Sequence, residues 1–352
     1  MILREYGCAE HQHLLSTIDD RYPVFFLEPY STFIRTNGHG KMVLVFSDCG
    51  SICAPVRLFK VRFFKLAQFE YPPVRGGQRL EPAEEADFLA SVVEYFRRLR
   101  VCHRVIQSPP HCLFRKAPPD VTSCRFGTYV LDLRARSEGE LLSGLHPDHR
   151  REIRQARDRG VQVEFGASHL EDCFRLCSET MQRSDMSFMS REDFTSFHRH
   201  LSHLPNAVCG VAYHQGVPLG ALWVPFTKAR AFYISGGSAA EMTVPGANKL
   251  LHWETIQYLR LQGVAAYDFV GARLSEVRGT KLENLQRFKA RFGGILEQGC
   301  LWKTDLARPM ARLFDFLLAS RQRLRGKPAL GQGDIIDQER RREAASLQSA
   351  SP

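Results

Sequence analysis

Two short stretches, around residues 270 and 290, contain the side chains with the clearest chemical potential. Residues 267–272 form an apolar run with one acid and one glycine, which predicts a buried strand that ends in a turn. The apolar residues that follow recur every three to four positions, which predicts an amphipathic helix that the glycine pair at 293–294 ends. The carboxylate of Asp268 would then face the ammonium of Lys289. Such a pair could move a proton or stabilise developing charge, although an aspartate at a strand end also caps turns.

The length and the order of elements predict a two-domain α/β protein. A chain of 352 residues is longer than one ordinary core requires. Residues 41–106 and 208–270 repeat one order, which is three strands, a glycine-containing loop, a long helix and a short strand. A strand, a helix and a further strand in this order imply a crossover connection, which predicts a mixed, mostly antiparallel sheet flanked by helices in each half. We predict domains at 1–136 and 137–325 with a cleft between them, and a disordered, polar tail at 326–352.

Charge and cysteine usage restrict the partners. The formal net charge is +10, which favours polyanionic or phosphorylated partners, although a generally basic surface without a nucleic-acid role fits equally well. The ten cysteines include no Cys-x-x-Cys pair and no histidine at ligand spacing, so no metal site is predicted. Several cysteines lie inside apolar runs, which is typical of a reducing cytosol.

The apolar segments do not predict a membrane span. The first residues include early acids and no long apolar run, so we expect no secretory signal. Residues 207–227 carry no Asp, Glu, Lys or Arg over 21 positions, which is long enough to cross a bilayer. Turn chemistry at 214–218 divides this run, so it predicts two strands joined by a tight hairpin. We expect a soluble, cytoplasmic protein, with peripheral contact at the inner face of the membrane left open.

Four stretches in the chain, taken in order, resemble the Fem-type branch of the GNAT acyltransferase superfamily. They are the helix at 146–156, the run at 232–238, the Tyr-Asp-Phe at 267–269, and the Phe-Lys at 288–289 with its following glycine pair. This branch includes the peptidoglycan-bridge aminoacyltransferases and related proteins of polysaccharide and cellulose gene clusters. The resemblance covers about residues 140–303. It implies two tandem GNAT-like domains, in agreement with the repeat, and transfer of an acyl group to an amine.

Two features expected of relatives are missing. No sustained heptad repeat occurs between residues 160 and 208, so the coiled-coil arm of the bridge-forming enzymes is not expected. Acetyl-CoA-dependent GNAT proteins usually hold the pyrophosphate with an Arg/Gln-x-x-Gly-x-Gly/Ala loop, and the loop at 238–248 lacks this pattern. The absence of this pattern and the basic net charge favour aminoacyl-tRNA as the donor, whereas the absence of the coiled-coil arm favours an acyl-CoA or acyl-carrier-protein thioester. A non-catalytic binding module with this fold is the third alternative.

The resemblance implies an N-acyltransferase for an amine acceptor, phosphorylated or lipid-linked, in cell-envelope, polysaccharide or natural-product synthesis. By this resemblance Lys289 stabilises the oxyanion and the phosphate-bearing end of the donor, and Phe288 stacks on the donor or shapes the site. Asp268 removes the amine proton or orients the acceptor, or it is structural if the substrate assists itself. No cofactor beyond the donor substrate is implied.

Five further residues are candidates for substrate binding. Arg183 lies in a Thr-x-x-Arg-like stretch associated with acceptor binding and suits bidentate phosphate recognition, and Asp185 would position that arginine or the amine. A surface ion pair is the alternative for both. Tyr233 either lines the cleft or packs in the core. Arg150 and Arg154 share one helix face that could contact the phosphates of tRNA or a lipid-linked acceptor, unless neighbouring acids pair with them.

Overall fold

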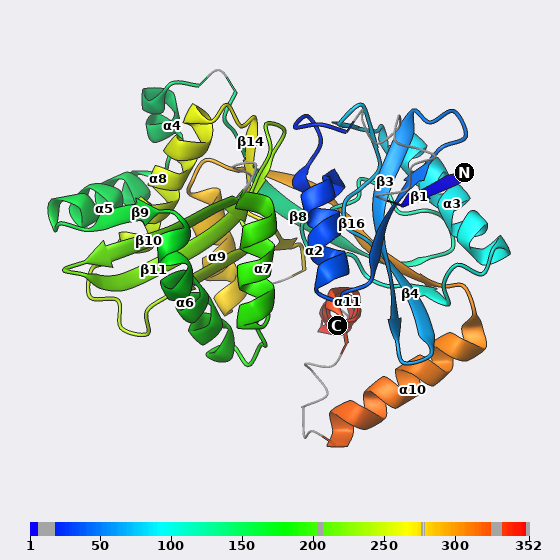
Figure 1. Cartoon of the computed structure of the whole chain (residues 1–352). Helices are drawn as coiled ribbons and strands as arrows, with labels where there is room; N and C mark the ends of the chain where they lie inside the picture. Colours follow the sequence, from blue (N-terminus) through cyan, green and yellow to red (C-terminus); the bar gives the residue numbers. More distant parts are fainter. Residues whose placement is uncertain are drawn as a thin grey trace.

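In the part of the chain that the structure describes, the strands form two sheets, which helices flank (Figure 1). The computed structural model describes residues 1–5, 18–134, 136–202, 207–275, 277, 279–324 and 333–349. In the larger sheet the strand order is β1-β2-β3-β4-β7-β16-β8-β14-β12. In addition, β15 pairs with β8, and β5 pairs with β3 and β6. The smaller sheet has the order β13-β11-β10-β9. The predicted α/β class, with mixed sheets and helices, is confirmed.

The bounds of the elements follow the chain order. The first part contains β1 (Ile2–Glu5), η2 (Val24–Phe26), α2 (Glu28–Thr36), β2 (Lys41–Phe46), β3 (Ile52–Val61), β4 (Phe64–Phe69), β5 (Val74–Arg75), β6 (Gln78–Arg79), α3 (Pro82–Arg98), β7 (Arg104–Val105) and β8 (Thr122–Asp132). The middle contains α4 (Glu138–Gly144), α5 (Pro147–Asp158), β9 (Gln162–Phe165), η3 (Ala167–His169), α6 (Leu170–Gln182), α7 (Arg191–Ser202), β10 (Ala207–His214), β11 (Val217–Pro225), β12 (Ala231–Phe232) and β13 (Ser235–Ser238). The last part contains α8 (Ala247–Leu261), β14 (Ala266–Asp268), β15 (Ala272–Arg273), α9 (Lys281–Ala290), β16 (Ile295–Asp305), α10 (Arg308–Leu324) and α11 (Ile335–Ser349).

Each half contains two parallel strands joined through a helix, as the repeated order of elements predicted. In the first half β4 and β7 are parallel and α3 connects them. Pro82 begins α3, Glu84 and Glu85 lie in its first turn, and Arg97 and Arg98 lie in its last, so both ends complement the helix dipole. In the second half β12 and β14 are parallel and α8 lies between them in the chain.

The two halves share one continuous sheet, because the late strand β16 lies between two early strands. Residues 295–303 of β16 pair with β8, and residues 304–305 pair with β7. In Figure 1, β8 and β16 run between the green and yellow half and the blue and cyan half. Phe33 of α2 also stacks on Phe197 of α7, with ring centroids 4.4 Å apart, in a core cluster that both halves build. The boundary at 136/137 and the cleft between the halves stay predictions.

The uncharged run at 207–227 forms the predicted hairpin. Strands β10 and β11 pair antiparallel, and Gln215 and Gly216 in the turn both have a positive φ, as two-residue hairpin turns require. Among the described residues, no helix is both long enough and apolar enough to span a bilayer.

The structure corrects the prediction of a disordered tail at 326–352. Residues 335–349 form α11, while 326–332 and 350–352 lie outside the described residues. Ile336 is fully buried in a small cluster with Phe126 of β8 and Leu301 of β16. The polar composition of this segment hid the helix, because two isoleucines at its start and several ion pairs hold it rather than a broad apolar face.

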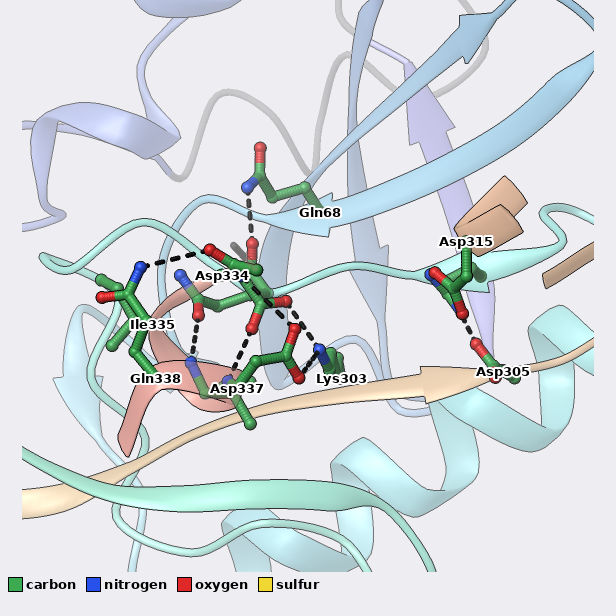
Figure 2. Close-up of polar contacts among 12 residues, drawn as sticks. Gln68, Lys303, Asp305, Asp315, Asp334, Ile335, Asp337 and Gln338 are labelled. Carbon is green, nitrogen blue, oxygen red and sulfur yellow. Dashed lines mark hydrogen bonds and ion pairs between the residues drawn. The ribbon is translucent and has the colours of Figure 1, made fainter. Parts of the chain in front are cut away.

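Ion pairs join the start of α11 to the strands β15 and β16. The carboxylate of Glu339 is fully buried and lies 2.8 Å from Arg273 Nη1 of β15. Lys303 Nζ of β16 lies 2.9 Å from Asp334 and 2.6 Å from Asp337, as Figure 2 shows. Breaking a buried pair leaves one charge without a partner, so Glu339 is the residue on which docking of α11 most depends.

Replacing Glu339 by alanine is expected to destabilise the fold. Glu339→Ala should lower the free energy of unfolding by roughly 3 kcal/mol, because Arg273 keeps its charge in a mostly buried place and loses its acidic partner. The matched control is Arg340→Ala at the exposed neighbouring position, which should stay within about 0.5 kcal/mol of the wild type. Urea denaturation followed by circular dichroism measures both. Equal stability of the two variants would contradict the docking assignment.

Candidate active site

The candidate site is built around a left-handed turn between β14 and β15. Both strands pair with β8: Asp268 lies opposite Val130, and Ala272 lies opposite Gly127. Three residues separate Asp268 from Ala272, whereas two separate Gly127 from Val130, so the turn contains one extra residue. Val270 has φ 50° and Gly271 has φ 77°. A β-branched residue at positive φ is an outlier that costs about 1–3 kcal/mol, and such strain concentrates at functional sites.

The turn directs two backbone carbonyls at Lys289. The Nζ of Lys289 donates hydrogen bonds to the carbonyl oxygens of Val270 and, at 2.7 Å, Gly271. The side chain is only 4% exposed. Burial lowers the pKa of Lys289 to about 8, against the opposing effect of the Asp268 carboxylate. Near neutral pH the amine is therefore charged but close to losing its proton.

The carboxylate of Asp268 is buried and has partners on both oxygens. Its Oδ1 accepts hydrogen bonds from the hydroxyl of Thr128 and, at 2.8 Å, from the backbone N–H of Val270. Its Oδ2 lies 3.5 Å from Arg230 Nε. Burial raises the pKa of Asp268, although Arg230 and Thr128 oppose this shift. Asp268 thus holds the backbone of the turn whose carbonyls accept hydrogen bonds from Lys289.

Arg230 connects this acid to the other half of the molecule. It lies between β11 and β12 in the chain, and its Nη2 is 3.1 Å from Glu297 Oε2 on β16. Tyr71, which follows β4, also favours the charged form of Arg230. Burial disfavours the charge, but the carboxylates of Asp268 and Glu297 outweigh this effect and raise the pKa of Arg230.

Helix α9 positions Phe288 and Lys289 because its end is determined by a glycine. The N–H of Gly293 bonds to the carbonyl of Ala290, and Gly293 has φ 80°. A Cβ at this position would lie 2.9 Å from the carbonyl oxygen of Gly144, so only glycine fits. The predicted helix and its glycine end are confirmed.

Two buried histidines border Phe288. The ring of Phe288 lies 5.2 Å from that of His252 and 5.6 Å from that of His149. Burial lowers the pKa of both histidines to about 3, so both are neutral at physiological pH. The Nδ1 of His252 is 3.1 Å from the hydroxyl of Tyr267, whereas the Nδ1 of His149 is buried without a partner among the described residues.

Tyr233 belongs to this group as well. Its ring lies 4.6 Å from His252, and its N–H bonds to the carbonyl of Asp268 at 2.8 Å. Its hydroxyl lies over Gly236, where a Cβ would be 1.9 Å from it. Burial raises the pKa of Tyr233. Lys289, Asp268, Phe288 and Tyr233 are therefore brought together, while their functional roles stay predictions.

The other four predicted residues lie elsewhere. Arg183 bonds to the carbonyl of Ser238 and so holds the start of the loop before α8, while Asp185 is exposed after α6. Arg150 donates to the carbonyls of Ser143 and Leu145 at the end of α4, and Arg154 is exposed. No contact described between residues of the chain joins any of these four to Lys289. Their roles in binding substrate stay predictions.

Sequence reasoning missed four members of the site, namely Thr128, Arg230, His149 and His252. His252 had a usable signal, because it interrupts the apolar side of α8 between Leu251 and Trp253. The other three had none, since each gains its partner only through contacts between distant segments. No group of three or more His, Cys, Asp or Glu suited to a metal occurs within the described ranges.

The lowered pKa of Lys289 can be measured directly. In protein labelled with ¹³C-lysine, one side-chain resonance should titrate near pH 8, whereas ordinary lysines titrate near about 10.4. Its absence from Lys289→Gln identifies it. Asp268→Asn should lower the midpoint further, because the Asp268 carboxylate stabilises the ammonium, while Asp158→Asn on the surface should leave it unchanged. A midpoint near 10 would mean that Lys289 is solvated.

Comparisons with known proteins show which family model and which solved structures the chain resembles. Residues 146–281 match the family described as an acetyltransferase (GNAT) domain, and no curated protein matches the chain. FemX superposes with a TM-score of 0.66 at 14% identity, covering 89% of this chain and 99% of FemX. The C-terminal domain of an Agrobacterium fabrum protein assigned as a lysylphosphatidylglycerol synthetase gives 0.51 at 17% identity, covering 88% and 96%. A Bacteroides thetaiotaomicron protein of unknown function gives 0.50 at 11% identity, covering 86% and 100%.

Identities this low show a shared fold rather than a shared reaction. The family match covers the turn at 269–271 and the helices α5 and α8, whose histidines His149 and His252 lie against Phe288, and it ends before Lys289. Residues 146–281 therefore resemble a GNAT acetyltransferase domain, and the chain has the fold of FemX over most of its length.

Proposed function

We propose that this protein is an N-acyltransferase that moves an activated acyl or aminoacyl group to an amine acceptor in cell-envelope, polysaccharide or natural-product synthesis. The observation that carries the proposal is the buried ammonium of Lys289. An ammonium has three N–H donors, and two of them bind the carbonyls of Val270 and Gly271. Within the described residues the third has no hydrogen-bond acceptor, so we assign it to the oxyanion, and the low local dielectric would strengthen that interaction.

The reaction follows from this arrangement. The neutral amine of the acceptor attacks the carbonyl carbon of the donor ester or thioester, and the tetrahedral oxyanion forms against Lys289. Collapse of the intermediate forms the amide bond and expels the alcohol or thiol of the donor, which takes up the proton that the amine loses. Because Oδ1 of Asp268 accepts two hydrogen bonds and Oδ2 lies 3.5 Å from the guanidinium of Arg230, we assign Asp268 a positioning role rather than that of the base.

Aminoacyl-tRNA is the donor that we favour. The net charge of +10 suits a polyanionic donor, and the loop at 238–248 lacks the usual pyrophosphate pattern. In this loop Gly246 packs so closely on α5 that a Cβ would lie 2.4 Å from the carbonyl oxygen of Glu152. The Agrobacterium fabrum protein of the same fold is, by its name, linked to an aminoacylated lipid.

A thioester donor is the second candidate, and one observation favours it. Helix α8 begins directly after Gly246 and has no acid in its first turn, so its N–H groups could hold a phosphate of acyl-CoA or of an acyl carrier protein. A purely binding function is less consistent with the site, because a buried lysine and a left-handed valine both cost stability without serving packing.

Loss of the ammonium should remove most of the activity. Lys289→Ala should lower kcat by about 10²–10³, because one oxyanion donor is lost, with little change in KM for the acceptor. Lys228→Ala, which changes an exposed lysine, should retain wild-type kcat. Steady-state rates with labelled donor measure both variants. Full activity of Lys289→Ala would overturn the proposed mechanism.

The donor class can be separated in the same assay. Wild-type protein is incubated with tRNA charged with a radiolabelled amino acid, or with radiolabelled acetyl-CoA, and label is followed into small primary amines. If RNA carries the donor, RNase treatment of the charged tRNA before the reaction should abolish transfer, whereas transfer from acetyl-CoA would be unaffected. Label transferred from acetyl-CoA alone would favour the second candidate.

The assignment of Asp268 has its own test. Asp268→Asn should lower kcat roughly 10- to 100-fold, because the turn that holds Lys289 shifts, while the acidic limb of the pH–rate profile persists. If Asp268 were instead the base, its raised pKa would create that limb and the substitution would abolish it. Asp158→Asn on the surface of α5 serves as the matched control.

A further inference from the structure

The tip of the β3–β4 hairpin contacts helix α10, and both elements carry exposed apolar side chains. The rings of Phe63 and Phe64 lie 4.3 Å apart at the tip, and Phe64 packs edge-on against Phe314 of α10 at 4.9 Å. In Figure 1 the tip of this hairpin reaches down to α10, which extends away from the body of the molecule. We call this region the α10 surface. Its large exposed apolar side chains are Val61, Phe63, Leu313 and Phe316.

The exposure of these side chains is unusual for aromatic residues. Phe63 is 53% exposed and Phe316 is 68% exposed. Neither supports the core, because the inward contacts of the two elements are made by Phe64 and Phe314. Several large exposed apolar side chains on two adjoining elements suggest a site of interaction.

Cations without acidic partners surround these side chains. Lys60, Arg62 and Lys65 belong to the hairpin, and Arg308 and Arg312 belong to α10. All five are exposed, and none forms an ion pair with an acid in the described part of the chain. Lys60 and Lys65 are direct cross-strand partners, an arrangement of like charges that costs stability unless an anion binds there.

Two acids near this surface share one arginine, so their remaining negative charge is small beside the five cations. Asp315 is the one acid in the sequence of α10, and both of its oxygens bind Arg104, at 2.6 and 2.7 Å. Asp305 binds the same guanidinium at 2.5 Å. Arg308, Arg312 and Phe316 follow at i, i+4 and i+8, so cations and an aromatic ring share one face of the helix.

We propose that the α10 surface binds a membrane that contains anionic lipids. Phe63 and Phe316 would enter the boundary between headgroups and acyl chains, while the five cations lie at the level of the lipid phosphates. A second copy of this chain fits less well, because a symmetric contact would bring the same cations together. This inference concerns a surface away from Lys289 and does not depend on the proposed function, but it would bring the protein to a lipid-linked acceptor.

Vesicle binding tests the proposal with the full chain. Wild-type protein should co-sediment with vesicles of phosphatidylcholine and phosphatidylglycerol at low salt, and hardly with phosphatidylcholine alone. Arg62→Glu and Arg312→Glu should each weaken binding by about fivefold or more, because each cation near an anionic surface contributes favourably. Phe63→Ser with Phe316→Ser should weaken it at least tenfold without lowering Tm, since both rings are exposed.

Matched changes on the opposite half provide the control. Val217→Ser alters an exposed apolar residue at the other hairpin tip, and Arg159→Glu alters an exposed cation after α5. Both variants should bind vesicles as the wild type does. Equal binding by the α10-surface variants, or no binding of the wild type to anionic vesicles, would overturn the proposal. Concentration-dependent dimerisation that these variants abolish would assign the surface to a second copy and would equally overturn it.

Discussion

The structure of the candidate site depends on the buried ammonium of Lys289, which requires hydrogen-bond acceptors. Lys289 is almost fully shielded from water, and a buried charge without partners is very costly. Its two acceptors exist because Val270 and Gly271 take the left-handed conformation, which a valine adopts only under constraint from its surroundings. The extra residue between β14 and β15 creates this turn, and Asp268 bonds to its backbone. The turn, the acid and the lysine therefore require one another.

The constraint extends from the turn to the junction of the two halves. Asp268 is held by Arg230, which also reaches Glu297 of β16, the late strand inserted between β7 and β8. The site thus rests on strands whose order in the sheet differs from their order in the chain. Close to the same turn, Arg273 of β15 pairs with Glu339 of α11. The C-terminal helix consequently supports the strand that follows the turn, and loss of its contact would loosen one side of the site.

Much of the local structure could be predicted from patterns in the sequence. The amphipathic spacing before residues 293–294 gave the correct helix and end, because Gly293 occupies a left-handed position where a Cβ would collide with a carbonyl. The hairpin at 207–225 was recognisable from its turn residues. Asp268 and Lys289 were expected to face each other, but among the described contacts no ion pair joins them. Lys289 instead binds the carbonyls of Val270 and Gly271, and the carboxylate only opposes the fall in the pKa of Lys289. His149 and α11 could not be predicted, because their burial depends on segments far away in the chain.

By itself the sequence determined many of the elements and their faces, although not α11, since periodicity and turn chemistry act over a few neighbouring residues. It also indicated which two residues could do chemistry. Only the tertiary structure decided which polar groups lose their water and which partners they receive. Arg230 and Glu297 are 67 positions apart, and Arg273 and Glu339 are 66 apart, so no local pattern could pair them. The lowered pKa of Lys289 has the same origin, because desolvation is a property of everything packed around a group rather than of the group's own segment.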